Sequence, residues 1–185
     1  MNREAAFALL GQYVKNENMI RHCLASEAVL RALAVRLNQD AELWAIAGLV
    51  HDVDVEITGS DPAQHCRVAA QLLADNGYPQ ELIAAVRLHN EAAWPGEKRA
   101  SIFQHALAAG ETITGLITAT TLVYPDKKLA SVKSKSVVKR MKETKFAASV
   151  SRENIMECEL TGVPLPEFAE LAVNAMREIA PELGL

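Results

Sequence analysis

The chain has 185 residues, half of them hydrophobic and 5% aromatic, with a formal net charge of −4 at pH 7. This length fits a single domain and supplies enough apolar surface for a core without disulfide bonds. The acidic balance argues against a general nucleic-acid binder, so we expect no DNA partner. The three cysteines form no CxxC motif, the N-terminus lacks a signal-peptide pattern, and no apolar run is long enough to span a membrane. These features predict a cytoplasmic protein without membrane contact.

Apolar residues recur at helical spacing through almost the whole chain, and no segment alternates as a strand would. The sequence therefore predicts an all-α fold, a compact helical bundle. We expect one domain over residues 1–185, with a core at about 18–123 and a C-terminal helical extension at about 124–185. The predicted helices cover about 2–14, 18–37, 40–52, 61–76, 79–90, 98–123, 151–160 and 166–180, with a partly helical basic segment at 127–145.

The fourth predicted helix has clear local signals at both ends. Asp61 is suited to be its N-cap, Pro62 its first residue and Gln64 its third. Asn76-Gly77 offers a left-handed stop at the other end. We therefore expect this helix to begin at Asp61, directly after a loop.

Four of the five histidines lie near predicted helix ends, on faces that also carry apolar residues. One inward histidine is more often a hydrogen-bonded core residue than a metal ligand. Four of them would be costly to bury without partners, and the adjacent Asp52 adds a carboxylate. Imidazole and carboxylate are both good ligands for divalent transition metals, so the pattern favours a metal site. The four residues are His22, His51, His65 and His89.

The order of these residues resembles the HD-domain metal-dependent phosphohydrolases. The resemblance covers about residues 18–120, and the matching segments are Arg21–Ala25, Ala47–Asp54 and Asp61–His65. Farther along the chain, three segments look like a bacterial clade of HDIG-type predicted hydrolases. These segments are Thr114–Ala119, Lys135–Lys139 and Phe146–Ala148.

The resemblance implies a primary ion held by His22, His51, Asp52 and an acid on a long helix. The expected aspartate falls on Glu111, counting back from Thr114. Glutamate is one methylene longer than aspartate. It could still ligate, with Gly110 beside it adding backbone freedom, or it could shift or weaken the ion.

In two-metal relatives, histidines at the positions of His65 and His89 hold a second ion, and the aspartate of the pair bridges both. Asn90 stands where some of these relatives have a further histidine, which leaves occupancy of the second position open. The resemblance thus implies one or two divalent ions as cofactors. Mixed imidazole and carboxylate ligation does not choose among Mn, Fe, Co, Ni, Zn and Mg.

The activity implied is hydrolysis of a phosphate mono- or diester, from a small phosphorylated molecule or a nucleotide, by metal-activated water. Asp52 would serve catalysis as the shared ligand. Asp54 or Glu56 could orient water or protonate a leaving group, or both could be solvated loop acids. Lys133 and Lys135 could bind substrate phosphate, unless their basic segment is a solvated helix face.

Two other functions remain open from the sequence. The chain could be a non-catalytic regulatory domain of the same fold that binds a metal or a nucleotide, and Glu111 and Asn90 favour that alternative. It could also be a helical protein with a metal held only for stability. Open coordination positions would distinguish a catalytic ion from a structural one. The sequence leaves the oligomeric state undetermined.

Overall fold

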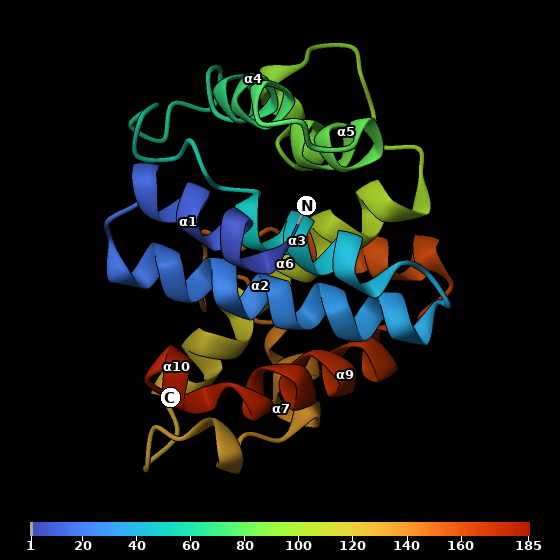
Figure 1. Ribbon diagram of the computed structural model, residues 1–185. Coiled ribbons are helices and arrows are strands. Elements are labelled where there is room, and N and C mark those ends of the chain that lie inside the picture. Colours follow the sequence, from blue (N-terminus) through green and yellow to red (C-terminus); the bar gives the residue numbers. More distant parts are fainter. Residues whose placement is uncertain (1) are drawn as a thin grey trace.

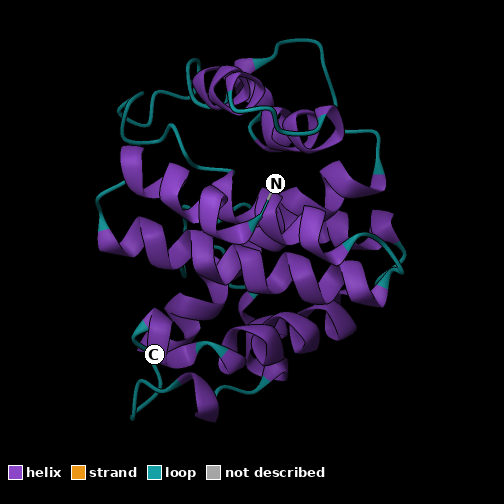
Figure 2. Ribbon diagram, in the orientation of Figure 1, coloured by secondary structure: helices purple, strands orange, loops and turns teal. Residues whose placement is uncertain are grey.

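The computed structural model describes residues 2–185, and all regular structure in that range is helical (Figures 1 and 2). This confirms the predicted all-α fold. None of the described helices combines the length and apolar character needed to cross a bilayer. The α-helices are α1 (Arg3–Tyr13), α2 (Glu17–Arg36), α3 (Ala41–Val50), α4 (Arg67–Asp75), α5 (Gln80–His89), α6 (Ile102–Leu122), α7 (Ser134–Arg140), α8 (Arg152–Met156), α9 (Leu165–Glu178) and α10 (Ala180–Leu183). Short 3₁₀-helices are η1 (Glu91–Ala93), η2 (Leu129–Ser131) and η3 (Glu157–Thr161).

Helix α2 is the centre of the arrangement. It packs most extensively on α3 and also contacts α6, α9 and α10. Figure 1 shows α4 and α5 at one end of the molecule and α7, α9 and α10 at the other, with α2 between them. A single hydrophobic core extends across these layers and includes Leu10, Ile117 and Phe168, all fully buried. The C-terminal extension therefore shares its core with the rest of the chain.

Two glycines allow the central helices to approach one another closely. A Cβ atom at Gly48 of α3 would lie 2.6 Å from the backbone oxygen of Ser26 on α2. A Cβ atom at Gly110 of α6 would collide with the side chain of Leu30, also on α2. Both glycines are helical, so their contribution is space rather than backbone freedom. The prediction that Gly110 adds freedom beside Glu111 is corrected accordingly.

Helix α4 begins at Arg67, well after the predicted start at Asp61. The Asp61 carboxylate accepts a hydrogen bond from the backbone N–H of Ala63 at 2.9 Å, which closes a turn rather than a helix. Cys66, the N-cap, has a left-handed backbone with φ 76° and makes no side-chain capping bond. The Asp54 carboxylate instead accepts from the N–H groups of Cys66 and Ala69, at 2.9 and 2.8 Å. A tertiary contact, not the local cap, thus determines where α4 starts.

Candidate metal centre

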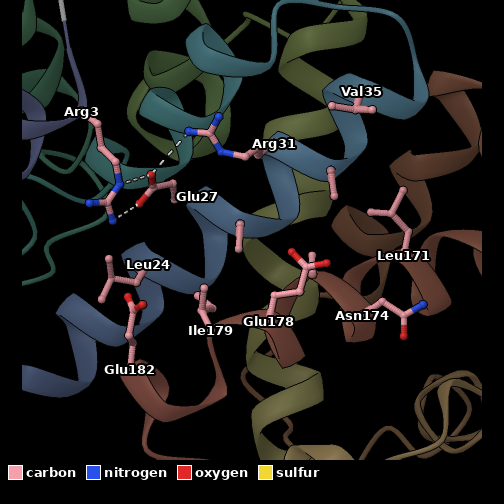
Figure 3. Close-up of a pocket in the computed structure, with 13 residues that line it drawn as sticks. Arg3, Leu24, Glu27, Arg31, Val35, Leu171, Asn174, Glu178, Ile179 and Glu182 are labelled. Atoms are coloured by element: carbon pink, nitrogen blue, oxygen red, sulfur yellow. Dashed lines mark hydrogen bonds and ion pairs between the residues drawn. The ribbon is translucent and has the colours of Figure 1, made fainter.

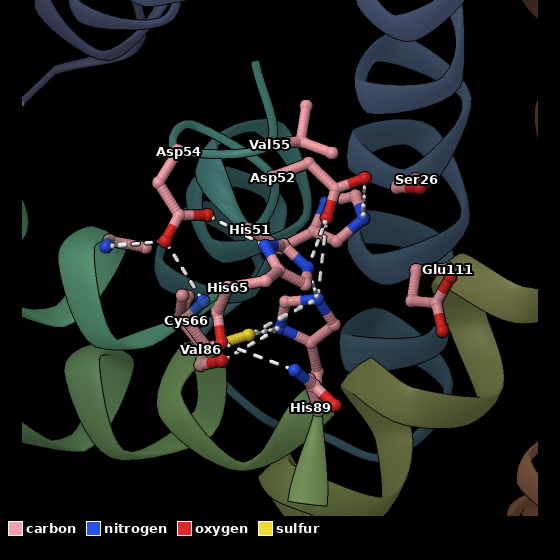
Figure 4. Close-up of polar contacts among 12 residues, drawn as sticks. Ser26, His51, Asp52, Asp54, Val55, His65, Cys66, Val86, His89 and Glu111 are labelled. Atoms are coloured by element: carbon pink, nitrogen blue, oxygen red, sulfur yellow. Dashed lines mark hydrogen bonds and ion pairs between the residues drawn. The ribbon is translucent and has the colours of Figure 1, made fainter. Parts of the chain in front are cut away.

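All six predicted ligand side chains converge from five segments of the chain, and Figure 4 labels every one except His22. Helix α2 carries one, the two residues that follow α3 carry two, and the turn before α4 carries one. The last residue of α5 and the middle of α6 carry the others. Three of them are buried and three are half-buried. The residues, in chain order, are His22, His51, Asp52, His65, His89 and Glu111.

The first group consists of His22, His51, Glu111 and one oxygen of Asp52. The Nε2 atoms of His22 and His51 lie 3.1 Å apart. Asp52 Oδ2 is 3.6 Å from His22 Nε2 and 3.4 Å from His51 Nε2. Glu111 Oε2 is 3.7 Å from His22 Nε2. These atoms surround one point between α2, α3 and α6.

The second group consists of His65, His89 and the other oxygen of Asp52. The two Nε2 atoms lie 3.2 Å apart. Asp52 Oδ1 is 3.2 Å from His65 Nε2 and 3.3 Å from His89 Nε2. Figure 4 shows these three side chains directed toward one another. Asp52 therefore faces the first group with Oδ2 and the second group with Oδ1.

The other ring nitrogen of each histidine is occupied by a hydrogen bond. His51 Nδ1–H donates to the Gly48 carbonyl at 2.8 Å, and His89 Nδ1–H donates to the Val86 carbonyl at 2.7 Å. His65 Nδ1 is 2.7 Å from Asp54 Oδ1, and His22 Nδ1 is 2.9 Å from Thr114 Oγ1. The Thr114 hydroxyl donates to the Glu111 carbonyl, which leaves its oxygen free to accept from His22. Carbonyl and carboxylate oxygens only accept, so in the neutral form of each ring the proton sits on Nδ1 and Nε2 keeps its lone pair.

This arrangement fits divalent ions. In each group, two Nε2 lone pairs face each other at 3.1 or 3.2 Å, and such a contact needs a proton or a cation between the atoms. Ligands about 2.1 Å from one ion lie about 3.0–3.4 Å from each other, close to most of the separations in both groups. Imidazole nitrogens with carboxylate oxygens are also the donors that divalent transition metals take. The residues present therefore fit the expected cofactor.

The acid–base state of the two groups differs when no ion is bound, and in the second group, where the pKa values of His65 and His89 are both raised, a metal ion would have to displace protons from these rings. Burial disfavours a charged ring at His65, but hydrogen bonds to Asp52 and Asp54 outweigh it and raise the pKa of His65 to about 12. Burial likewise opposes ionisation of Asp52, yet the surrounding imidazoles hold the pKa of that carboxyl well below its ordinary value. At His51, burial dominates and lowers the pKa to about 3, so this ring is neutral at physiological pH and can ligate.

The HD domain family matches residues 19–118, which is 100 of the 185 residues (118 − 19 + 1). The chain belongs to the HD domain family. All six ligand candidates lie inside the matched range. HD domains bind divalent metal ions, and the histidine and acid clusters of this chain could hold one. Comparison with curated proteins and with solved structures gave no match.

In this HD domain Asp54 does not fit the predicted role of orienting water or protonating a leaving group. Its side chain is fully buried. One oxygen bonds to His65, and the other accepts from the backbone of Cys66 and Ala69. With both oxygens occupied and no solvent access, Asp54 is suited to orienting His65. Glu56, the other acid considered, accepts from the N–H groups of Lys15 and Asn16 and so supports the loop before α2.

Lys133 and Lys135 are not among the residues around the two groups. They lie at the start of α7, which packs on α9 and α6. In Figure 1 this end of the molecule is opposite α4 and α5, the helices beside the second group. Both lysines are exposed and line a shallow cavity with Glu170 and Arg177 of α9. The separation does not support contact between these lysines and a phosphate at the cluster.

Two further residues support the cluster, and sequence reasoning did not assign them. Thr114 lies one turn after Glu111 on α6, and this helical spacing could have identified it. Arg99 is nearly buried and donates to the carbonyls of Leu88 and His89, at 2.8 and 3.3 Å, at the end of α5. Arg99 also pairs with Glu157 of the C-terminal extension. No local pattern around Arg99 indicates this contact.

Cys66 lies beside the second group. Its Sγ is 3.3 Å from His89 Nδ1 and 3.7 Å from Nε2. The ligand atoms of Cys66, His65 and His89 all lie within 4.8 Å of one another, so the sulfur is close enough to contribute to an ion at the second group. Sequence reasoning did not include Cys66 among the candidate ligands.

Proposed function

We propose that this HD domain is a metal-dependent phosphohydrolase that cleaves a phosphate mono- or diester of a small molecule or nucleotide. The observation that carries the proposal is the orientation of four histidines, whose Nε2 lone pairs face two adjacent points with Asp52 in common. Divalent ions bound there would lower the pKa of a coordinated water and neutralise charge on the phosphoryl group. Four imidazoles favour a transition metal over Mg²⁺.

The protein residues would contribute position and shielding. Asp52 keeps the two points close together because its two oxygens serve different groups. The Nδ1 hydrogen bonds hold each ring in one orientation, so little reorganisation is needed on binding. Burial of His51 and His89 limits competing water, while His22 keeps about a quarter of its side chain exposed (23%) toward solvent.

Metal content and turnover test the proposal together. The purified protein would be stripped of metal, reloaded in turn with Mn²⁺, Co²⁺, Ni²⁺, Zn²⁺ and Mg²⁺, and assayed with p-nitrophenyl phosphate, bis-p-nitrophenyl phosphate and nucleotides. We expect up to two bound ions per chain and metal-dependent turnover, and the loss of both in Asp52→Ala. Tight binding of metal and nucleotide without any turnover would instead support a regulatory domain.

Glu111 gives a second test, because it stands where the family resemblance leads us to expect aspartate. Its Oε2 reaches to within 3.7 Å of His22 Nε2, so we propose that glutamate is an adapted ligand here. Glu111→Asp should then weaken the first ion and lower turnover. A gain in turnover would indicate that the longer side chain distorts the site.

A further inference from the structure

A cavity of about 390 Å³ lies between α2, α6 and the turn Leu183–Leu185. Its wall includes His22 of the first group and Thr114, which is hydrogen-bonded to the His22 ring. His22 is also the most exposed of the four histidines, with 23% of its side chain accessible against 1% for His51. Of the six ligand candidates His22 alone lines this cavity, so the cavity borders the first group at its least buried ligand.

The wall of this cavity carries a cation that is weakly paired. Arg21 of α2 lines the cavity, and 43% of its side chain is exposed. Its ion-pair partner is Glu17 at 3.4 Å, and that carboxylate is itself 82% exposed. Such exposed pairs contribute little, so the guanidinium is available to a ligand oxygen. Arginine is well suited to phosphate and carboxylate oxygens.

The remaining wall is mixed in character. Leu122 contributes an apolar side chain that is 52% exposed, and Asn18 and Thr118 contribute polar groups. A volume of about 390 Å³ lies near the lower end of the range of small-molecule sites, about 300–1,000 Å³. The space therefore fits one compact organic group with both apolar and polar surface.

We propose that this cavity binds the organic part of a small phosphomonoester, up to the size of a nucleoside monophosphate, and that Arg21 donates a hydrogen bond to an oxygen of that substrate. The inference rests on the proposed function, because the ions at the two groups would hold the phosphate. It favours monoesters within that function, because the cavity would hold their one organic group.

A second, larger cavity provides a matched control. It has a volume of about 660 Å³, lies between α2 and α9, and borders none of the six ligand candidates (Figure 3). Its arginines, Arg3 and Arg31, are both paired with the buried Glu27, and Arg31 also pairs with Glu42, so their two charges are balanced by two carboxylates. Val35, 68% exposed, lines this cavity on the same helix as Arg21.

Filling each cavity with a tryptophan tests the proposal. Thr118→Trp should reduce turnover of p-nitrophenyl phosphate and adenosine monophosphate at least ~10-fold, with the number of bound Mn²⁺ ions unchanged. Val35→Trp should leave both turnover and metal content as in the unaltered protein. The unaltered protein should also cleave adenosine monophosphate faster than bis-p-nitrophenyl phosphate.

Arg21 is tested separately, because it is exposed and its replacement should not affect folding. Arg21→Gln should raise KM for adenosine monophosphate ~10-fold through loss of a charged hydrogen bond, with kcat nearly unchanged, and Arg21→Lys should recover part of that loss. Absence of metal from the unaltered protein would contradict the proposed function itself. Normal metal content and normal kinetics in both Thr118→Trp and Arg21→Gln would overturn the cavity assignment alone.

Discussion

The two halves of the metal centre are built in different ways. The first group stands on α2, α3 and α6, which pack directly on one another where Gly48 and Gly110 leave room. The histidines of the second group come from a turn and from the last residue of α5; the His65 ring donates a hydrogen bond to Asp54, and Arg99 donates to the backbone carbonyls of Leu88 and His89. Helix packing therefore sets the first ion position, whereas a polar network sets the second. We expect the second position to be the more sensitive to changes outside the ligands.

The largest expected effect comes from removing one histidine from each group. His51→Ala should lower affinity for the first ion more than ~100-fold and abolish turnover. Removing a residue that only hydrogen-bonds to a ligand typically lowers metal affinity about 10–100-fold, and His51 is itself a ligand candidate. His65→Ala should leave one ion bound. Isothermal titration with Mn²⁺ checks both variants. Equal loss of both ions in His65→Ala would contradict independent halves.

Asp54→Asn should lower affinity for the second ion about 10–100-fold, because an amide cannot replace the carboxylate that orients His65. The same change removes one of the acceptors at the start of α4. Affinity for the first ion should stay within about threefold of the unaltered value, as expected for separate sites. Titration resolves the two ions, and an equal decrease in both would show that Asp54 supports the whole centre.

Gly48→Ala tests the packing that forms the first group. The new methyl would lie 2.6 Å from the Ser26 carbonyl oxygen, so α3 must move away from α2. We expect the free energy of unfolding to fall by roughly 1–3 kcal/mol, as for other overpacked cores. Urea denaturation measures this, and Gly11→Ala, where a Cβ meets no neighbour, is the control.

Arg99→Met should weaken the second ion by no more than ~10-fold, since Arg99 acts only through the backbone of His89. Arg36→Met is the matched control, because Arg36 forms an exposed ion pair with Glu167. The number of ions bound at saturating Mn²⁺ should remain two in both variants. A loss confined to the first ion in Arg99→Met would contradict the division between the halves.

The smallest effect is expected from the basic helix. Replacing Lys133 and Lys135 together by glutamine should change kcat/KM less than about twofold, because neither lysine approaches the cluster and both are solvated. A loss of tenfold or more would restore the sequence-based prediction that they bind substrate. Steady-state kinetics with adenosine monophosphate decides between the two.

Much of the fold was predictable, because helical periodicity and the end signals of long helices are local properties. Helix α6 illustrates this, because the helix predicted over about 98–123 runs from Ile102 to Leu122, although the Ser101–Gln104 capping box at its start was not used in the prediction. The start of α4 was predicted wrongly. Asp61 does not cap the helix; the Asp54 carboxylate, from an earlier loop, accepts the hydrogen bonds at its start instead. The roles of Asp54 and of the two lysines depend equally on distant contacts, which a single sequence does not contain.

By itself, the sequence determined the helical class, the membership of the HD pattern and the identity of the six side chains that gather at the centre. These follow from residue type and order, because spacing along helices fixes which faces are apolar and which carry imidazole or acid. The tertiary structure decided which nitrogen of each ring is free, how Asp52 divides its oxygens, and which cavity borders His22. Those properties arise only when segments far apart in the chain are packed together.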